Sequence, residues 1–148
     1  MFEESLKITG SLKIDVFGSD GVIKDSREVK NLVVTSGKTF IASRMVGTSS
    51  NVMSHMELGT GTTAAAVGNT TLETVISASR TALSSGTSST NVVTYVASFP
   101  AGTGTGAVTE AGIFNAASAG TMLCRTVFSV VNKGADDAMS ITWTITVS

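Results

Sequence analysis

Two short stretches of the chain carry glycines at spacings that nucleotide-binding proteins use. Gly59-x-Gly61-x-x-Ala64, within "MELGTGTTA", fits a loose dinucleotide-binding fingerprint, and "TSGKT" at residues 35–39 looks like the end of a phosphate-binding loop. Both motifs hold phosphate by letting backbone N–H groups approach it, usually at the start of a helix. The first question is therefore whether this chain is a nucleotide enzyme.

Spacing and context argue against both nucleotide sites. A phosphate-binding loop needs a glycine five positions before Gly37, and this chain has Leu32 there. The dinucleotide fingerprint needs a βαβ unit and an acidic residue about 20 positions further on, where Ser79 and Ser84 stand instead. We therefore expect a helix start at 35–39, a loop after a strand at 59–64, and no bound cofactor.

The other reactive side chains lack the partners that catalysis needs. His55 is the single histidine, and it shares one face of an expected strand with Glu57. Such a pair could move a proton, but a surface or interface pair is the favoured interpretation. Cys124 is the single cysteine, which excludes an internal disulfide and a cysteine-based metal motif. Its apolar neighbours predict a buried, unreactive thiol, so we expect no catalytic residue and no metal site.

The most unusual charge is Glu110, which stands between Thr109 and Ala111 in an expected strand. We expect it to pair with Arg125 or Arg80 across neighbouring strands. A structural ion pair is the favoured interpretation, and a catalytic carboxylate is the alternative.

The composition is rich in uncharged polar residues and poor in charged ones. Serine and threonine supply 42 of the 148 residues, the net charge is −1, and 13 of the 21 charged side chains fall within residues 1–45. This balance gives no electrostatic reason to expect nucleic acid or a membrane surface as partner, and the first residues resemble neither a signal peptide nor a membrane span. Residues 46–148 must stay soluble through exposed hydroxyl faces or through burial against other subunits.

Hydrophobic alternation predicts an all-β protein. Apolar residues at every second position predict strands at 5–17, 52–58, 91–99, 106–114, 121–131 and 139–147. Ser36 as N-cap and Gly47 as terminator predict one short helix at about 37–46, and residues 84–91 are expected to form a flexible tip. We expect an antiparallel β-sandwich core over 46–148, a charged N-terminal hairpin or arm over 1–45, and one compact unit. The expected core residues include Phe114, Phe128 and Trp143.

Residues 55–147 resemble small virion structural proteins of tailed bacteriophages. The shared theme is "GTGTT", then "TEAGIFN" and "GTML" followed by an arginine, and finally a strand centred on tryptophan. "EAGIFN" and "GTML" are also similar to pieces of phage tail-fibre proteins. The resemblance implies a β fold without catalytic residues.

The resemblance and the composition together lead to one expectation about function. We expect a capsid decoration (cement) protein that is made in the host cytoplasm, forms a homotrimer and binds the major capsid protein on the assembled head. The alternative is a tail-fibre or tail-tip protein that contacts a host glycan. Charge placement suggests five shell-contacting residues, although a solvated hairpin face explains the same charges: Lys7, Lys13, Lys24, Arg27 and Lys30.

Overall fold

The computed structural model describes residues 4–48 and 50–148, and it confirms the all-β prediction. One helix, α1 (Thr35–Arg44), accompanies the strands. The strands are β1 (Ile8–Phe17), β2 (Ile23–Val33), β3 (His55–Gly59), β4 (Thr81–Ala82), β5 (Ser85–Ser89), β6 (Val92–Phe99), β7 (Gly106–Phe114), β8 (Met122–Lys133) and β9 (Ala138–Val147). None of the helices in the described ranges is long and apolar enough to cross a membrane.

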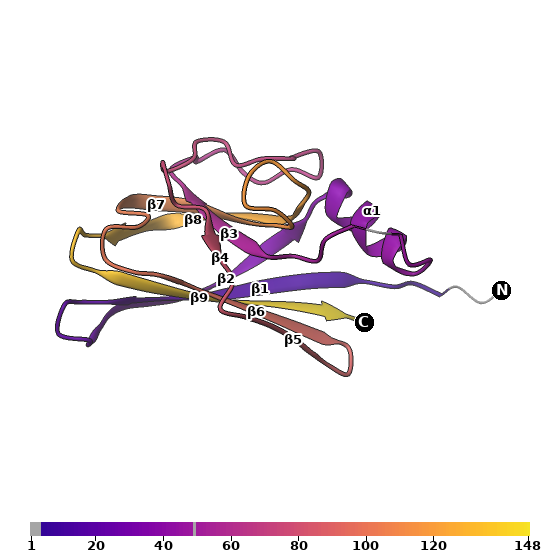
Figure 1. Cartoon of the computed structure of the whole chain (residues 1–148), viewed down its shortest axis with the longest axis horizontal. Helices are drawn as coiled ribbons and strands as arrows, with labels where there is room; N and C mark the ends of the chain where they lie inside the picture. Colours follow the sequence, from indigo (N-terminus) through magenta and orange to yellow (C-terminus); the bar gives the residue numbers. More distant parts are fainter. Residues whose placement is uncertain (1–3, 49) are drawn as a thin grey trace.

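All the strands belong to one antiparallel sheet that curls on itself. Their order is β4-β3-β7-β8-β2-β1-β9-β6-β5, and the curling places the β3–β7–β8 layer across from the β1–β9–β6 layer (Figure 1). β2 joins the two layers, because it pairs with β1 along most of its length but with β8 only through Leu32 and Val33. The sheet is therefore a sandwich that is closed along one side by a shared strand.

The main core fills the space between the two layers. β1 and β9 pair along their whole length, and the register sets Leu12 opposite Trp143 and Ile14 opposite Ile141. These four side chains are almost fully buried, as the period-2 pattern requires. Phe128 also belongs to this core, whereas Phe114 is buried in a second, smaller cluster. The smaller cluster lies on the other side of the β3–β7–β8 layer and consists of Val34, Leu72, Phe114 and Met122.

The N-terminal hairpin is an internal part of the sheet. β1 lies between β2 and β9, and β2 lies between β1 and β8. The expected division into an arm over 1–45 and a core over 46–148 therefore does not correspond to a division of the fold. The reason is that Leu12, Ile14 and Val16 fill the main core, while the alternate positions of β1, which include Ser11 and Lys13, face outwards.

The helix begins earlier than expected and without the expected cap. It starts at Thr35, its N-cap residue is Val34, and no side chain caps it. The Ser36 hydroxyl donates instead to the carbonyl oxygen of Met122. Gly37 packs so closely on β8 that a Cβ atom there would lie 2.2 Å from the Leu123 carbonyl oxygen. Gly47, with a φ of 68°, follows the last turn as expected.

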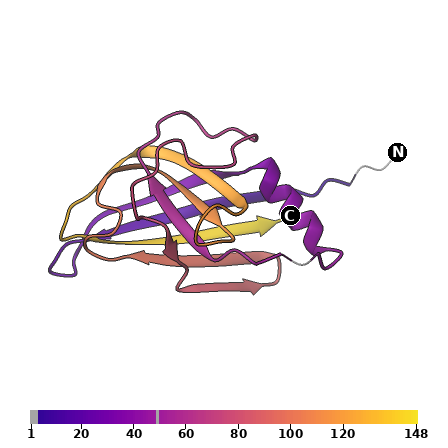
Figure 2. The ribbon, with the colours of Figure 1, turned by 45° about the horizontal axis from the view of Figure 1, so that its top comes forward.

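Two segments without a clear sequence pattern complete the fold. Residues 60–80 form a long loop that covers the outside of the β3–β7–β8 layer (Figure 2). Residues 85–89, expected to be a flexible tip, form β5, which pairs with β6 from Ser85 opposite Val96 to Ser89 opposite Val92. Cross-strand pairing, and not local hydrophobicity, makes this segment a strand.

Trp143→Ala should destabilise the protein by about 3–5 kcal/mol, because it leaves a large cavity in the main core. Thr142→Ala removes a half-exposed side chain from the other face of β9 and should cost less than about 1 kcal/mol. Urea unfolding of both variants measures the two losses. Equal, small losses would show that the two faces of β9 are assigned wrongly.

Candidate functional site

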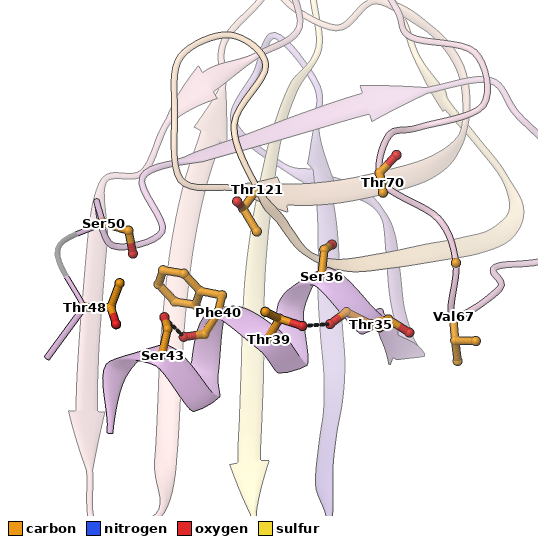
Figure 3. A pocket seen from close by; sticks show the side chains of 11 residues that line it. Thr35, Ser36, Thr39, Phe40, Ser43, Thr48, Ser50, Val67, Thr70 and Thr121 are labelled. Carbon is orange, nitrogen blue, oxygen red and sulfur yellow. Dashed lines mark hydrogen bonds between the residues drawn. The ribbon is translucent and has the colours of Figure 1, made fainter. Parts of the chain in front are cut away.

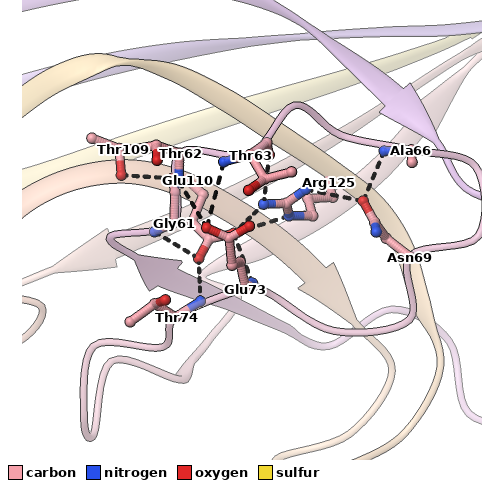
Figure 4. Close-up of polar contacts among 10 residues, drawn as sticks. All are labelled: Gly61, Thr62, Thr63, Ala66, Asn69, Glu73, Thr74, Thr109, Glu110 and Arg125. Carbon is pink, nitrogen blue, oxygen red and sulfur yellow. Dashed lines mark hydrogen bonds and ion pairs between the residues drawn. The ribbon is translucent and has the colours of Figure 1, made fainter.

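The glycine-rich loop does hold an anion, and that anion is Glu110 of the chain itself (Figure 4). The Glu110 side chain is fully buried on β7. Its Oε1 atom accepts hydrogen bonds from the backbone N–H groups of Gly61, at 3.0 Å, and Thr74, at 2.8 Å. Its Oε2 atom accepts one from the N–H of Glu73, at 3.0 Å. The loop thus supplies backbone donors to a carboxylate in the way a phosphate-binding loop supplies them to phosphate.

Arg125 on β8 neutralises this carboxylate. Its Nε and Nη2 atoms lie 2.9 Å and 2.8 Å from Glu110 Oε2, and both side chains are almost completely excluded from solvent. The guanidinium also donates to the Asn69 side-chain oxygen, at 3.0 Å, and to the Thr63 carbonyl oxygen, at 3.1 Å. This ion pair therefore holds two parts of the loop, residues 61–63 and residues 69–74.

The two glycines of the motif are explained by close approach to Glu110. A Cβ atom at Gly59 would lie 2.4 Å from Glu110 Oε1, and one at Gly61 would lie 2.5 Å from it. Any larger residue would push the loop off the carboxylate. The spacing that resembles a nucleotide fingerprint is thus required by an internal contact.

The Glu110 centre has no capacity left for a substrate. Backbone and guanidinium donors already surround the carboxylate, which has about four lone-pair positions, and neither partner has solvent access. Glu73 closes the loop above it by accepting the N–H groups of Thr62 and Thr63. A hydrogen bond from the Thr63 side chain and these N–H groups lower the Glu73 pKa. The arrangement is structural, as the favoured interpretation of Glu110 requires.

Glu57 forms an ion pair with Arg80 and not with His55. Arg80 contacts Glu57 through Nε, at 2.9 Å, and its guanidinium carbon lies 3.7 Å from the centre of the Phe114 ring. His55 Nδ1 is hydrogen-bonded to the Ser54 hydroxyl at 2.8 Å. His55 and Glu57 therefore do not form the acid–base pair that their sequence spacing allows.

The single cysteine, Cys124, is also a structural side chain. Cys124 is completely buried, and burial raises the pKa of its thiol, which agrees with an unreactive side chain. Within residues 4–48 and 50–148, no cluster of three or more histidine, cysteine or acidic residues could hold a metal ion.

The turn between β8 and β9 uses a third charged group. Asp137 accepts a hydrogen bond from the Gly134 N–H and one from Lys24 Nζ, each at 2.8 Å. The Lys24 contact, followed by the Gly134 contact, lowers the Asp137 pKa. Lys133 is buried beneath, where its Nζ donates to the carbonyl oxygens of Pro100 and Asp137. This network ties the β1–β2 hairpin to the β8–β9 turn.

The five basic residues proposed for shell contact fall into two groups. Lys24 is bound to Asp137, and Arg27 is bound to Asp25 and to the Ser129 carbonyl oxygen, so both serve the fold. Lys7, Lys13 and Lys30 are exposed. Lys13 and Lys30 point away from the core on β1 and β2, since their neighbours Leu12 and Val29 point towards it. The Nζ atom of Lys13 lies 3.9 Å from the Oδ2 atom of Asp15.

Beside these lysines lies a broad surface that we call the hydroxyl face. It consists of the outward positions of β1, β9 and β6, where the register places Ser11 and Thr94 on either side of Thr144. Its serine and threonine members are Thr9, Ser11, Thr94, Ser98, Ser140, Thr142, Thr144 and Thr146. β5, β6 and β9 contain no charged residue at all. The charges on this face come from β1, where Lys13 lies opposite Thr142 and Asp15 opposite Ser140.

A pocket lies beside α1, and most of the residues that line it also carry hydroxyl groups (Figure 3). α1 forms one wall, and the loop at 67–70 and Thr121 form the opposite wall. Sequence reasoning missed this pocket, because its walls are far apart in the chain and the hydroxyl pattern of the helix alone does not indicate a cavity.

Comparisons with known proteins add no relative. A scan against protein-family models, a search of curated proteins and a search of solved structures each find no match to this chain.

Glu110→Gln should destabilise the protein by about 3–5 kcal/mol, because it leaves the Arg125 charge buried without a counter-charge. The double variant Glu110→Gln/Arg125→Met removes both charges and should lose clearly less than the sum of the two single variants. Urea unfolding gives all the values, with Glu28→Gln, a change at an exposed glutamate on β2, as matched control. A Glu110→Gln variant as stable as Glu28→Gln would contradict the structural role of the pair.

Asp137→Asn tests the β8–β9 turn through its pH dependence. Because the folded protein lowers the Asp137 pKa, the stabilising effect of the carboxylate is complete above the ordinary aspartate value of about 3.9. It is lost as the pH falls through the lower folded-state pKa. The wild type should exceed the variant in stability near neutrality, and the two should converge in strong acid.

Urea unfolding over that pH range measures the difference, with Asp136→Asn, a change at the exposed neighbour, as control. A difference between wild type and Asp137→Asn that stays constant down to strong acid would contradict the assignment.

Proposed function

We propose that this protein is a structural component of a tailed-phage virion and acts as a capsid decoration protein. It binds the outside of the assembled head shell through the hydroxyl face. The observation that carries the proposal is this face itself, a wide sheet surface with no charge on β5, β6 and β9. The resemblance of residues 55–147 to phage virion proteins supports the same function.

The edge of the sheet strengthens the argument that this surface is covered in the assembly. β5 is a terminal strand of the sheet, and all its residues are exposed. Free proteins usually protect such an edge with charges or proline, because its unpaired backbone groups can pair with another chain. β5 has the sequence SGTSS, which contains neither. An edge of this kind suits a protein whose neighbours in a lattice cover it.

The chemistry of the chain supports a mechanical role over a catalytic one. The buried charged groups each have a partner within the fold: Glu57, Glu110, Arg125, Lys133 and Asp137. Exposed Lys13 lies within the hydroxyl face, opposite Thr142, and exposed Lys30 lies next to that face, opposite Ser11. Both suit an acidic patch on the major capsid protein. Lys7, which directly precedes β1, is exposed as well.

Stabilisation of the shell follows from mass action. A protein that binds only the assembled state stabilises that state at each site, by about 2.7 kcal/mol when its free concentration is 100 times its Kd. Many copies on one lattice add these contributions. A homotrimer fits this role, because closed rotational symmetry matches the threefold axes of a shell.

Thr144→Asp tests the proposed binding face, because it places a charge at the centre of that face. Its matched control is Thr105→Asp, which changes an exposed threonine in the turn between β6 and β7. With shells that lack this protein, wild type and Thr105→Asp should co-sediment and raise the temperature of shell disruption. Thr144→Asp should bind at least about tenfold more weakly, equivalent to 1.4 kcal/mol, while circular dichroism shows that it folds.

The alternative function, a tail-fibre or tail-tip protein, predicts a different result. Shells would then be indifferent to the wild-type protein, and particles without it would fail to adsorb to cells. Equal shell binding by Thr144→Asp and Thr105→Asp would contradict the hydroxyl face as the contact surface.

A further inference from the structure

The pocket beside α1 has the size of a small-ligand site. Its volume is about 660 Å³, within the range of about 300–1,000 Å³ that ligand pockets occupy. Figure 3 shows Thr35, Thr39 and Ser43 along the helix and Thr70 and Thr121 across from them. These walls come from three separate segments, which the fold brings together beside the loop anchored on Glu110.

The lining of this pocket is uncharged and rich in hydroxyl groups. Of the eleven lining residues, eight are serine or threonine, and the other three are Phe40, Val67 and Gly68. Among the described residues, no charged side chain lines it. Phosphate, carboxylate and ammonium ligands would therefore lack a counter-charge. The exposed surface of the pocket is mostly apolar, with hydroxyl oxygens between the apolar groups, so it suits a neutral ligand that has both an apolar face and hydroxyl groups.

The hydrogen bonds within the pocket leave hydroxyl oxygens that can still bind a ligand. The hydroxyls of Ser36, Thr39 and Ser43 donate to backbone carbonyl oxygens, at 2.9, 3.1 and 2.7 Å. Their oxygen lone pairs can still accept a hydrogen bond from a ligand. Thr70 and Thr121 also line the pocket, and a threonine hydroxyl can both donate and accept a hydrogen bond.

The residue types of α1 are better explained by the lining of the pocket than by the stability of the helix. Thr35, Thr39 and Ser43 follow one another at four-residue spacing on one face of α1. Threonine and serine are poorer helix formers than alanine, lysine or glutamate, which usually occupy exposed helix faces. Phe40, on the same side, is packed partly against the main core and offers an apolar ring surface to the pocket. Departures of this kind from local preference are expected at functional sites.

We propose that this pocket binds a neutral saccharide, with the Phe40 ring against the C–H face of a sugar and the threonine and serine hydroxyls bonded to its OH groups. The site goes beyond the proposed shell binding and is compatible with it. The pocket belongs to α1 and to loops over the β3–β7–β8 layer, whereas the hydroxyl face belongs to the outside of the β1–β9–β6 layer. A shell-bound copy could therefore hold a saccharide on its free side.

Titration of the ¹⁵N-labelled protein with glucose, galactose, N-acetylglucosamine and their β-1,4-linked disaccharides tests the proposal. At least one of them should shift the amide signals of Thr39, Thr70 and Thr121 in a saturable manner. Thr39→Val and Thr70→Val remove one hydroxyl each with little change of shape, and each should weaken that binding by about five- to tenfold. Thr142→Val, on the hydroxyl face, is the matched control and should bind as the wild type does.

Three results would overturn the proposal. One is that none of these saccharides shifts the pocket amides at concentrations up to roughly 50 mM, which excludes a Kd in the millimolar range. Another is that both pocket variants bind like Thr142→Val. The third is that glucuronate or glucose 6-phosphate binds the pocket more tightly than the neutral sugars, which would indicate recognition of an anion. Because none of these measurements involves shells, failure here leaves shell binding untouched.

Discussion

Glu110 carries a carboxylate into a part of the molecule that solvent does not reach, and a buried charge of this kind must be fully paired. Arg125 supplies the opposite charge, and the backbone N–H groups of Gly61, Glu73 and Thr74 supply the remaining donors. The loop over residues 60–80 lacks regular pairing of its own, so this pair determines where it lies. Burial of the small cluster around Leu72 and Phe114 beneath it follows from that position. One wall of the pocket, at 67–70, depends on the same anchor, because Arg125 holds Asn69.

The sequence predicts a strand correctly where its hydrophobic alternation matches the burial of the side chains in the fold. Period-2 alternation locates β7 and β9 to within a residue, and it places Trp143 on the core-facing side. Glu110 could be narrowed to two partners, Arg125 and Arg80, because a lone acid in an apolar strand needs a nearby cation. Local chemistry could not choose between them, since the choice depends on strand order: β8 is next to β7, whereas Arg80 lies beside β3 and is bound to Glu57.

Other parts of the fold are set by contacts that leave no local signal. β5 has no apolar residue, and its extended form comes from its pairing with β6. Serine is a common N-cap residue, but the Ser36 hydroxyl is bonded to β8, and the helix starts two residues earlier than expected, at Thr35. The glycines of "GTGTT" do mark an anion-binding loop, and only the fold reveals that the anion is internal. The sequence does not indicate that Lys24 pairs with Asp137, because the two residues are distant in the chain. Arg27 pairs with the nearby Asp25, but its bond to the Ser129 carbonyl oxygen is equally distant in sequence.

Most of the chemically distinctive side chains therefore serve the architecture, and the surfaces left for partners are the hydroxyl face and the pocket beside α1. The proposed function depends most directly on the first of these surfaces. A cryo-electron microscopy map of the virion tests this proposal. We expect density for this protein on the outer surface of the head lattice, with the β1–β9–β6 layer turned towards the major capsid protein. Density confined to the tail, or copies on the head whose hydroxyl face points into solvent, would contradict it.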